Sequence, residues 1–94
     1  MLHKYGLIRF SKKTGKIDTT MTAIGRGLIQ MWALNNTPQT KACVIVDLDT
    51  REVFAEYDGA PGGFPEIRKS PDDLIYEVPA ELVNILIAEE AKRE

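Results

Sequence analysis

The chain has 94 residues, of which 44% are hydrophobic and 28% charged. This length allows one small domain, and this composition is typical of a globular protein rather than a disordered one. No apolar run approaches the roughly 18 residues of a membrane span. Residues 1–6 also lack the long apolar segment of a secretory signal. We therefore expect one cytoplasmic domain over residues 1–94, of the compact kind that bacterial genomes and mobile elements encode.

The net charge of −2 hides an asymmetry along the chain. Residues 1–47 carry seven basic and two acidic side chains, a net charge of +5, whereas residues 48–94 carry five basic and twelve acidic ones, a net charge of −7. Such an asymmetry indicates a partner of one charge or complementary self-association. The simpler interpretation is that the two halves pack together and balance each other.

The N-terminal part of the chain predicts a hairpin followed by a helix. Lys4–Phe10 has strand composition, Ser11–Gly15 is a turn in which glycine can adopt a positive φ, and Lys16–Asp18 returns as a short strand. The following helix is expected over Met21–Asn35, where the Asn-Asn-Thr-Pro cluster ends it.

The predicted first helix carries more large apolar residues than a small two-layer domain must bury. At 100° per residue, one arc contains Met21, Ile24, Leu28, Met31 and Trp32, and we expect this arc to face the sheet. Ile29 then lies at the rim of the arc, Trp32 is large enough to reach past it, and Gly25 lets a neighbouring backbone approach closely. Exposed apolar area of this kind marks partner surfaces, where Trp and Met are enriched. Ile29, Trp32 and Gly25 are therefore the predicted partner interface.

The stretch Ala42–Tyr57 predicts the central β-hairpin. Its first strand is apolar enough to be buried on both faces, with Val44 and Val46 on one face and Cys43 and Ile45 on the other. Asp47 and Asp49 belong to the turn, where short polar side chains bond nearby backbone N–H groups. In the second strand, simple alternation places Glu52, Phe54 and Glu56 on one face and Val53, Ala55 and Tyr57 on the other.

The C-terminal part predicts a loop, a turn, a strand and a helix. Asp58–Pro65 contains three glycines and two prolines and is expected to be an irregular loop. Ser70–Asp73 reads equally as a helix start or a type I turn. Leu74–Val78 has strand composition, and Pro79–Arg93 is the second helix. The predicted fold is α+β in the order ββαββ(β)α, an antiparallel sheet of four or five strands with both helices packed on one face.

No motif in the sequence predicts a specific chemistry. Gly59–Pro65 lacks the Lys-Ser/Thr of a phosphate-binding loop, and the single Cys43 and single His3 give no metal-ligand spacing. A pairing of Cys43 with His3 for catalysis is less favoured than a buried structural cysteine, since reactive thiols need an accessible, electropositive setting. The Asp47-x-Asp49 pattern lacks the glycine and the distal glutamate of a calcium loop. We expect no catalytic residue, no metal site and no cofactor.

Three functional hypotheses follow from these observations. The first is a non-enzymatic protein–protein interaction module that forms a homodimer. The second is a nucleic-acid or anionic-ligand binder that uses Arg9, Lys12, Lys13 and Lys16 of the basic first hairpin; the acidic pI of about 5.4 disfavours it. The third is a small ligand-binding or enzymatic domain that uses the loop Gly59–Pro65. We favour the first, because the chain is short, carries surplus apolar residues on the first helix and lacks catalytic motifs.

Overall fold

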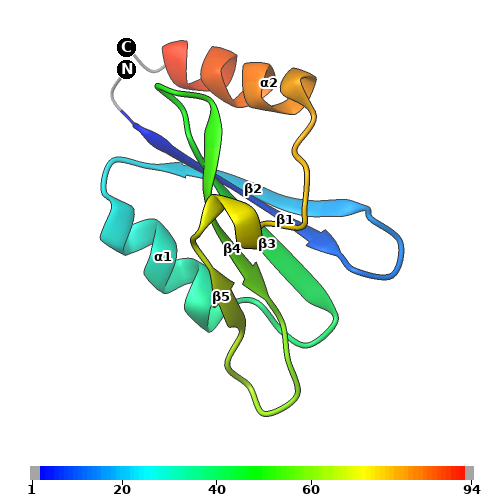
Figure 1. Ribbon diagram of the computed structural model, residues 1–94. Helices are drawn as coiled ribbons and strands as arrows, with labels where there is room; N and C mark the ends of the chain where they lie inside the picture. The colour runs from blue at the N-terminus through cyan, green and yellow to red at the C-terminus, as the bar shows by residue number, and fades with distance from the viewer. Residues whose placement is uncertain (1–2, 93–94) are drawn as a thin grey trace.

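A five-stranded antiparallel sheet and two α-helices make up the domain, as a computed structural model that describes residues 3–92 shows (Figure 1). The elements are β1 Tyr5–Ser11, β2 Ile17–Ala23, α1 Arg26–Asn35, β3 Lys41–Asp47, β4 Glu52–Asp58, β5 Glu66–Arg68, a 3₁₀ turn at Pro71–Asp73 and α2 Ala80–Ala91. The strands lie in the spatial order β2-β1-β3-β4-β5. The predicted α+β class, the antiparallel sheet and the order of elements are confirmed.

The two helices cover opposite faces of the sheet, whereas we predicted both on one face. The core cluster beneath α1 consists of Leu7, Ile29, Ala33, Cys43, Ile45, Ala55 and Tyr57. The cluster beneath α2 consists of Ile8, Val44, Val46, Leu48, Val83 and Leu86. The central strand β3 explains this arrangement, because residues 42–46 are all buried and both faces of the strand therefore need cover. The predicted division of Val44 and Val46 from Cys43 and Ile45 is confirmed.

The first helix is shorter than predicted, because the residues before it form an edge strand. β2 continues to Ala23 rather than ending at Asp18, and it pairs with β1 through partners such as Leu7 and Met21. Three threonines favour this extended conformation, since β-branched residues pack well on a pleated surface. Helix α1 therefore begins at Arg26, and Met21 belongs to the sheet.

The orientation predicted for α1 was wrong. Ile29 and Ala33 are fully buried against the sheet, one helical turn apart, and the small Ala33 allows the helix to lie close to β1 and β3. The arc of Ile24, Leu28 and Met31, which we expected to face the core, points to solvent. Of the other residues predicted on this arc, Met21 lies in β2 and Trp32 packs against the core, and Ile24 itself precedes the helix. Helical spacing therefore identified neither the whole face nor which side of α1 is buried.

A β-bulge breaks the alternation that we predicted for β4. Ile45 pairs with Ala55 and Val46 pairs with Val53, so Phe54 is an extra residue in the strand. Phe54 consequently joins the α1 side of the sheet, where its ring meets that of Tyr5 in an edge-to-face contact at 5.3 Å. Glu52, Phe54 and Glu56 therefore do not share one face.

The last strand of the sheet lies at Glu66–Arg68 and not at Leu74–Val78, where we predicted it. The fifth strand is β5, and residues 74–79, which we call the strap, cross the α2 face of the sheet in an extended conformation without joining the sheet. Helix α2 buries Val83, Leu86 and Glu90, whereas Ile85 is exposed. Arg93, the last residue of the predicted helix, lies outside the described residues.

The two predicted turns have the expected chemistry. Gly15 adopts a φ of 73°, and Asp47 Oδ1 accepts hydrogen bonds from the backbone N–H groups of Asp49 and Thr50. Within residues 3–92, neither helix has the length and apolar character needed to cross a membrane.

Candidate functional site

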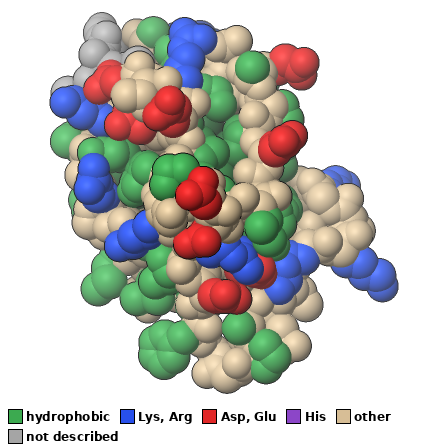
Figure 2. Space-filling view, in the orientation of Figure 1, with side chains coloured by type: hydrophobic (Ala, Val, Ile, Leu, Met, Phe, Trp, Pro, Cys, Tyr) green, Lys and Arg blue, Asp and Glu red, His purple; other side chains and the backbone are tan. Residues whose placement is uncertain are grey.

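An exposed apolar stripe is formed by Leu28 and Met31 on the outer face of α1 and by Ile24, which lies two residues before the helix begins. The exposed fractions of these side chains are 59%, 73% and 58%. Residues 27–35 contain no charged side chain. The exposed Arg26 lies between Ile24 and Leu28 in the sequence, and its guanidinium lies over the rings of Tyr5 and Phe54. Figure 2 shows hydrophobic side chains gathered on the lower part of one face, over α1 and the loop between β4 and β5. Covering these three large apolar side chains removes apolar area from water and is therefore favourable.

The three residues predicted as the partner interface occupy different environments. Ile29 is fully buried in the core beneath α1 and cannot contact a partner, which corrects its predicted place at the rim. Trp32 is half-buried against that core, and the Arg9 guanidinium lies 5.3 Å from its ring. Gly25 precedes α1, and a Cβ at this position would meet open space. Gly25 lies beside Ile24 of the stripe, and Trp32 follows Met31 in the helix.

Two of the four cations predicted to contact an anion are held by internal partners. Arg9 Nε donates to Asp18 Oδ1 at 2.9 Å, and its Nη1 donates to the carbonyl of Asn36 at 2.9 Å. Lys12 Nζ donates to Asp58 Oδ1 at 2.8 Å and to the carbonyl of Gly59 at 2.7 Å. Hydrogen bonds from Lys41 and Arg9 hold the pKa of Asp18 far below its usual value of 3.8. These cations tie the hairpin to the rest of the fold.

Lys13 and Lys16 lie in and beside the exposed turn of the first hairpin and form no ion pair within residues 3–92. The structure therefore does not bring the four predicted cations into one converging site. Of the four predicted cations, only these two lysines remain available to an anion.

The glycine-rich loop packs closely at its start and is open at its middle. Gly59 is buried, its N–H donates to the carbonyl of Lys41 at 3.0 Å, and a Cβ on Gly59 would overlap the carbonyl of Pro38. Gly62 and Gly63 adopt φ values of 102° and 95°. A cavity of about 410 Å³ lies between this loop and the end of α1, and its lining residues are Leu34, Asn35, Thr37, Pro38, Gln39, Ala60, Gly62 and Gly63. Because none of these side chains ionises, the loop offers hydrogen bonds but no acid or base.

Cys43 and His3 are not brought together. Cys43 is fully buried in the core beneath α1, where its Sγ lies 3.0 Å from the hydroxyl of Thr37, and burial raises the pKa of the thiol. His3 lies beside α2, with its Nδ1 2.8 Å from a carboxylate oxygen of Glu90 and 2.8 Å from the hydroxyl of Thr22. The prediction of a buried cysteine is confirmed.

A buried carboxylate that we did not predict holds the strap to the sheet. Glu56 is fully buried on β4, and the backbone N–H of Ile75 donates to both of its oxygens at 3.0 Å. The N–H of Tyr76 donates to Glu56 Oε1 at 2.6 Å. Arg68 Nη1 lies 3.6 Å from Glu56 Oε2 and supplies the opposite charge. The Glu56 carboxylate thus accepts the strap hydrogen bonds that the carbonyl groups of a paired strand would otherwise accept.

Asp58 links the strap, β5 and the first hairpin at the same edge of β4. Its carboxylate accepts hydrogen bonds from Lys12, from Arg68 Nη2 at 3.0 Å and from the Tyr76 hydroxyl at 3.1 Å. Burial alone would raise the pKa of Asp58, but these donors outweigh it and lower the pKa. Burial and the Asp58 carboxylate both raise the pKa of Tyr76. The group is a structural junction, since every one of its charges has an internal partner.

Replacing Glu56 with alanine is expected to release the strap. The variant loses the acceptor for the N–H groups of Ile75 and Tyr76 and leaves Arg68 beside an uncharged residue. Hydrogen bonds to charged groups contribute about 1.5–3 kcal/mol each, so we expect a loss of about 3 kcal/mol in the free energy of unfolding. Amide exchange at Ile75 and Tyr76 should accelerate more than exchange in β3.

Glu52→Ala is the matched control, because Glu52 lies on the same strand and is exposed. It should leave the denaturant midpoint and the strap amides nearly unchanged. Equal protection of Ile75 and Tyr76 in Glu56→Ala and the unmutated protein would show that Glu56 does not hold the strap.

Sequence reasoning missed Glu56 because a glutamate in a strand is ordinarily assigned to the solvated face. The local sequence carries no signal for this position, because the pairing of Glu56 with the buried Val44 depends on the bulge at Phe54.

Comparison with known proteins gives no match to a family model, to a curated protein or to a solved structure.

Proposed function

We propose that this protein is a small, non-enzymatic protein–protein interaction module that forms a homodimer through the outer face of α1. The carrying observation is the stripe of Ile24, Leu28 and Met31, which is large, apolar, uncharged and exposed. Most small homo-oligomers are two-fold symmetric, so each subunit contributes the same patch. A patch without charge suits this symmetry, since it brings no like charges together.

The glycines beside the stripe favour a close helix–helix contact. A Cβ added to Gly25 or Gly27 would meet no other atom within 4 Å, so both positions are open on the solvent side. In a two-fold pairing, these positions let the backbone of the partner approach α1. No internal packing requires a glycine at position 27, and close approach of a partner helix would explain it.

The charged groups and the cysteine support the non-enzymatic, cytoplasmic part of the proposal. Glu56, Asp58 and Arg68 are committed to holding the strap and β5. The free Cys43 is typical of a reducing compartment, where thiols stay unpaired. Binding of nucleic acid or another anion is the weaker alternative, because internal ion pairs engage Arg9 and Lys12.

Leu28→Asp tests the proposal by placing a charge at the centre of the stripe. We expect the unmutated protein to sediment as a concentration-dependent dimer and Leu28→Asp to sediment as a monomer with an unchanged circular dichroism spectrum. Ile85→Asp is the matched control, because Ile85 is 57% exposed on the other helix and lies outside the stripe.

Ile85→Asp should remain dimeric. A monomer at every concentration of the unmutated protein would refute the proposed homodimer. If Ile85→Asp dissociates and Leu28→Asp does not, the interface lies on α2 and the α1 assignment fails.

A further inference from the structure

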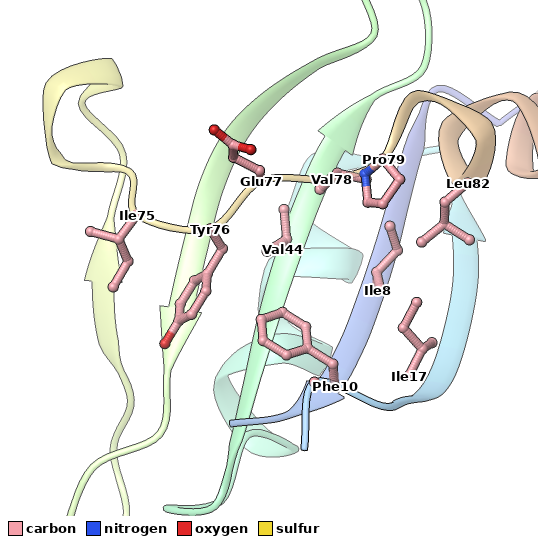
Figure 3. A pocket seen from close by; sticks show the side chains of 11 residues that line it. Ile8, Phe10, Ile17, Val44, Ile75, Tyr76, Glu77, Val78, Pro79 and Leu82 are labelled. Carbon is pink, nitrogen blue, oxygen red and sulfur yellow. The ribbon is translucent and has the colours of Figure 1, made fainter. Parts of the chain in front are cut away.

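A second apolar feature lies on the opposite side of the sheet from α1, between the strap and the first hairpin (Figure 3). This cavity has a volume of about 490 Å³, within the range of small-molecule sites. Its lining residues are Ile8, Phe10, Gly15, Ile17, Val44, Ile75, Tyr76, Glu77, Val78, Pro79 and Leu82. Ile8, Phe10 and Val44 form the floor, the strap forms one wall, and Ile17 and Leu82 stand opposite it.

The lining determines the charge of a ligand that the cavity accepts. None of the eleven lining residues is Lys, Arg or His, so no side-chain cation is present to bind a phosphate, sulfate or carboxylate. The ionisable lining residues are Tyr76 and Glu77. The Tyr76 hydroxyl donates to Asp58, and the exposed carboxylate of Glu77 repels an anion at the rim. The lining therefore favours an uncharged apolar molecule and disfavours an anionic one.

The strap wall is held in place before any ligand arrives. Glu56 fixes the backbone of Ile75 and Tyr76 from the sheet side, and the rings of Tyr76 and Phe10 meet edge-to-face at 5.0 Å. Tyr76 is also held through its side chain, because its hydroxyl donates a hydrogen bond to Asp58. A wall with these anchors does not need to be ordered on binding, and this preorganisation favours affinity.

We propose that this cavity binds a compact, uncharged apolar molecule, aromatic or branched aliphatic, one per protomer. Burial of such a molecule removes the exposed apolar side chains of Ile17 and Ile75 and the partly exposed ring of Phe10 from water, and this is the source of the affinity. Edge-to-face contact with Phe10 and Tyr76 favours an aromatic ligand further. The site is independent of the α1 stripe, because it lies on the other face of the sheet.

A pair of fluorescent probes of the same shape tests the charge selectivity. N-phenyl-1-naphthylamine is uncharged, and 8-anilino-1-naphthalenesulfonate adds one sulfonate to the same ring system. We expect saturable binding of the neutral probe with one site per protomer, and binding of the sulfonate at least about tenfold weaker. Ile17→Trp places an indole in the cavity from a half-exposed strand position, and we expect it to weaken neutral-probe binding about tenfold or more.

Controls separate this site from the α1 stripe. Ile85→Trp adds an exposed indole outside the cavity and should bind the neutral probe as the unmutated protein does. Leu28→Asp should also retain binding, whatever its effect on dimerisation, so that the two proposals fail separately. Leu82→Trp fills the cavity from α2, on the same side as Ile17, and replaces Ile17→Trp in this test if that variant does not fold.

Three results would overturn the proposal. The first is equal affinity for the two probes, and the second is unchanged neutral-probe binding in folded Ile17→Trp and Leu82→Trp. The third is a protein that does not bind the neutral probe but becomes monomeric when Ile17 is replaced by Trp. That last result would show that a second copy of the chain covers the cavity.

Discussion

Replacing Ile29 with aspartate is expected to unfold the protein rather than to separate its subunits. Ile29 is fully buried between α1 and the sheet, in contact with the cluster that contains Leu7, Cys43 and Ile45. The substitution removes a buried aliphatic side chain and buries a carboxylate without a partner. Loss of the side chain alone costs about 2–5 kcal/mol, and the buried charge adds to this, so the total approaches the whole stability of a domain this small.

Leu28→Asp is the matched control for this prediction, because it introduces the same charge at the neighbouring position on the exposed side of the helix. Urea denaturation followed by circular dichroism should show a native spectrum for Leu28→Asp and little or no folded Ile29→Asp. A native spectrum and an unchanged midpoint for Ile29→Asp would show that the orientation of α1 is wrong.

Replacing Gly59 with alanine is expected to have the second largest effect. A Cβ at this position would overlap the backbone of Pro38 and crowd the carbonyl of Lys41, and backbone atoms cannot rotate away as side chains do. The same residue joins β4 to β3 and to Lys12 through its own backbone groups. Overpacking of this kind typically costs about 1–3 kcal/mol. Because the clash is with backbone atoms, we expect the free energy of unfolding to fall by about 3 kcal/mol, as measured by thermal or urea denaturation.

Gly27→Ala is the control, because Gly27 lies inside α1 and a Cβ there meets no other atom within 4 Å. Alanine is about 1 kcal/mol more favourable than glycine in a helix interior. At concentrations at which the protein is monomeric, where the contact proposed for Gly27 is absent, this variant should therefore be slightly more stable than the unmutated protein. If Gly59→Ala and Gly27→Ala shift the midpoint in the same direction, the close approach of Gly59 to Pro38 is not present in solution.

The strands and helices could be predicted wherever one local pattern was dominant. The apolar run of β3, the Asp-rich turn after it and the glycine of the first turn each specify a backbone conformation within a few residues. Prediction failed where a segment had two plausible partners. Residues 17–23 suit a helix entry as well as a strand, and pairing with β1 decides the outcome. Such long-range pairing leaves no signature in the local sequence.

The sites were harder to predict than the elements because they depend on which face each element presents. Of the predicted apolar arc, only Leu28 and Met31 share the exposed face of α1. That face and the Ile29–Ala33 face are both apolar, and only packing against β1 and β3 distinguishes them. The cavity beneath the strap brings together residues separated by about seventy positions in the chain. Glu56 could not be assigned, because a one-residue bulge at Phe54 changes the alternation in the strand that carries it.

The two edges of the sheet differ in how readily they accept a foreign strand. β5 has only three residues, and the charged Arg68 and Glu66 occupy two of them, which makes this edge a poor template for strand pairing. β2 is seven residues long, with no proline or lysine, and half of its backbone N–H and C=O groups point away from β1. We therefore expect any growth of the sheet by strand addition to be directional, starting at Ile17–Ala23.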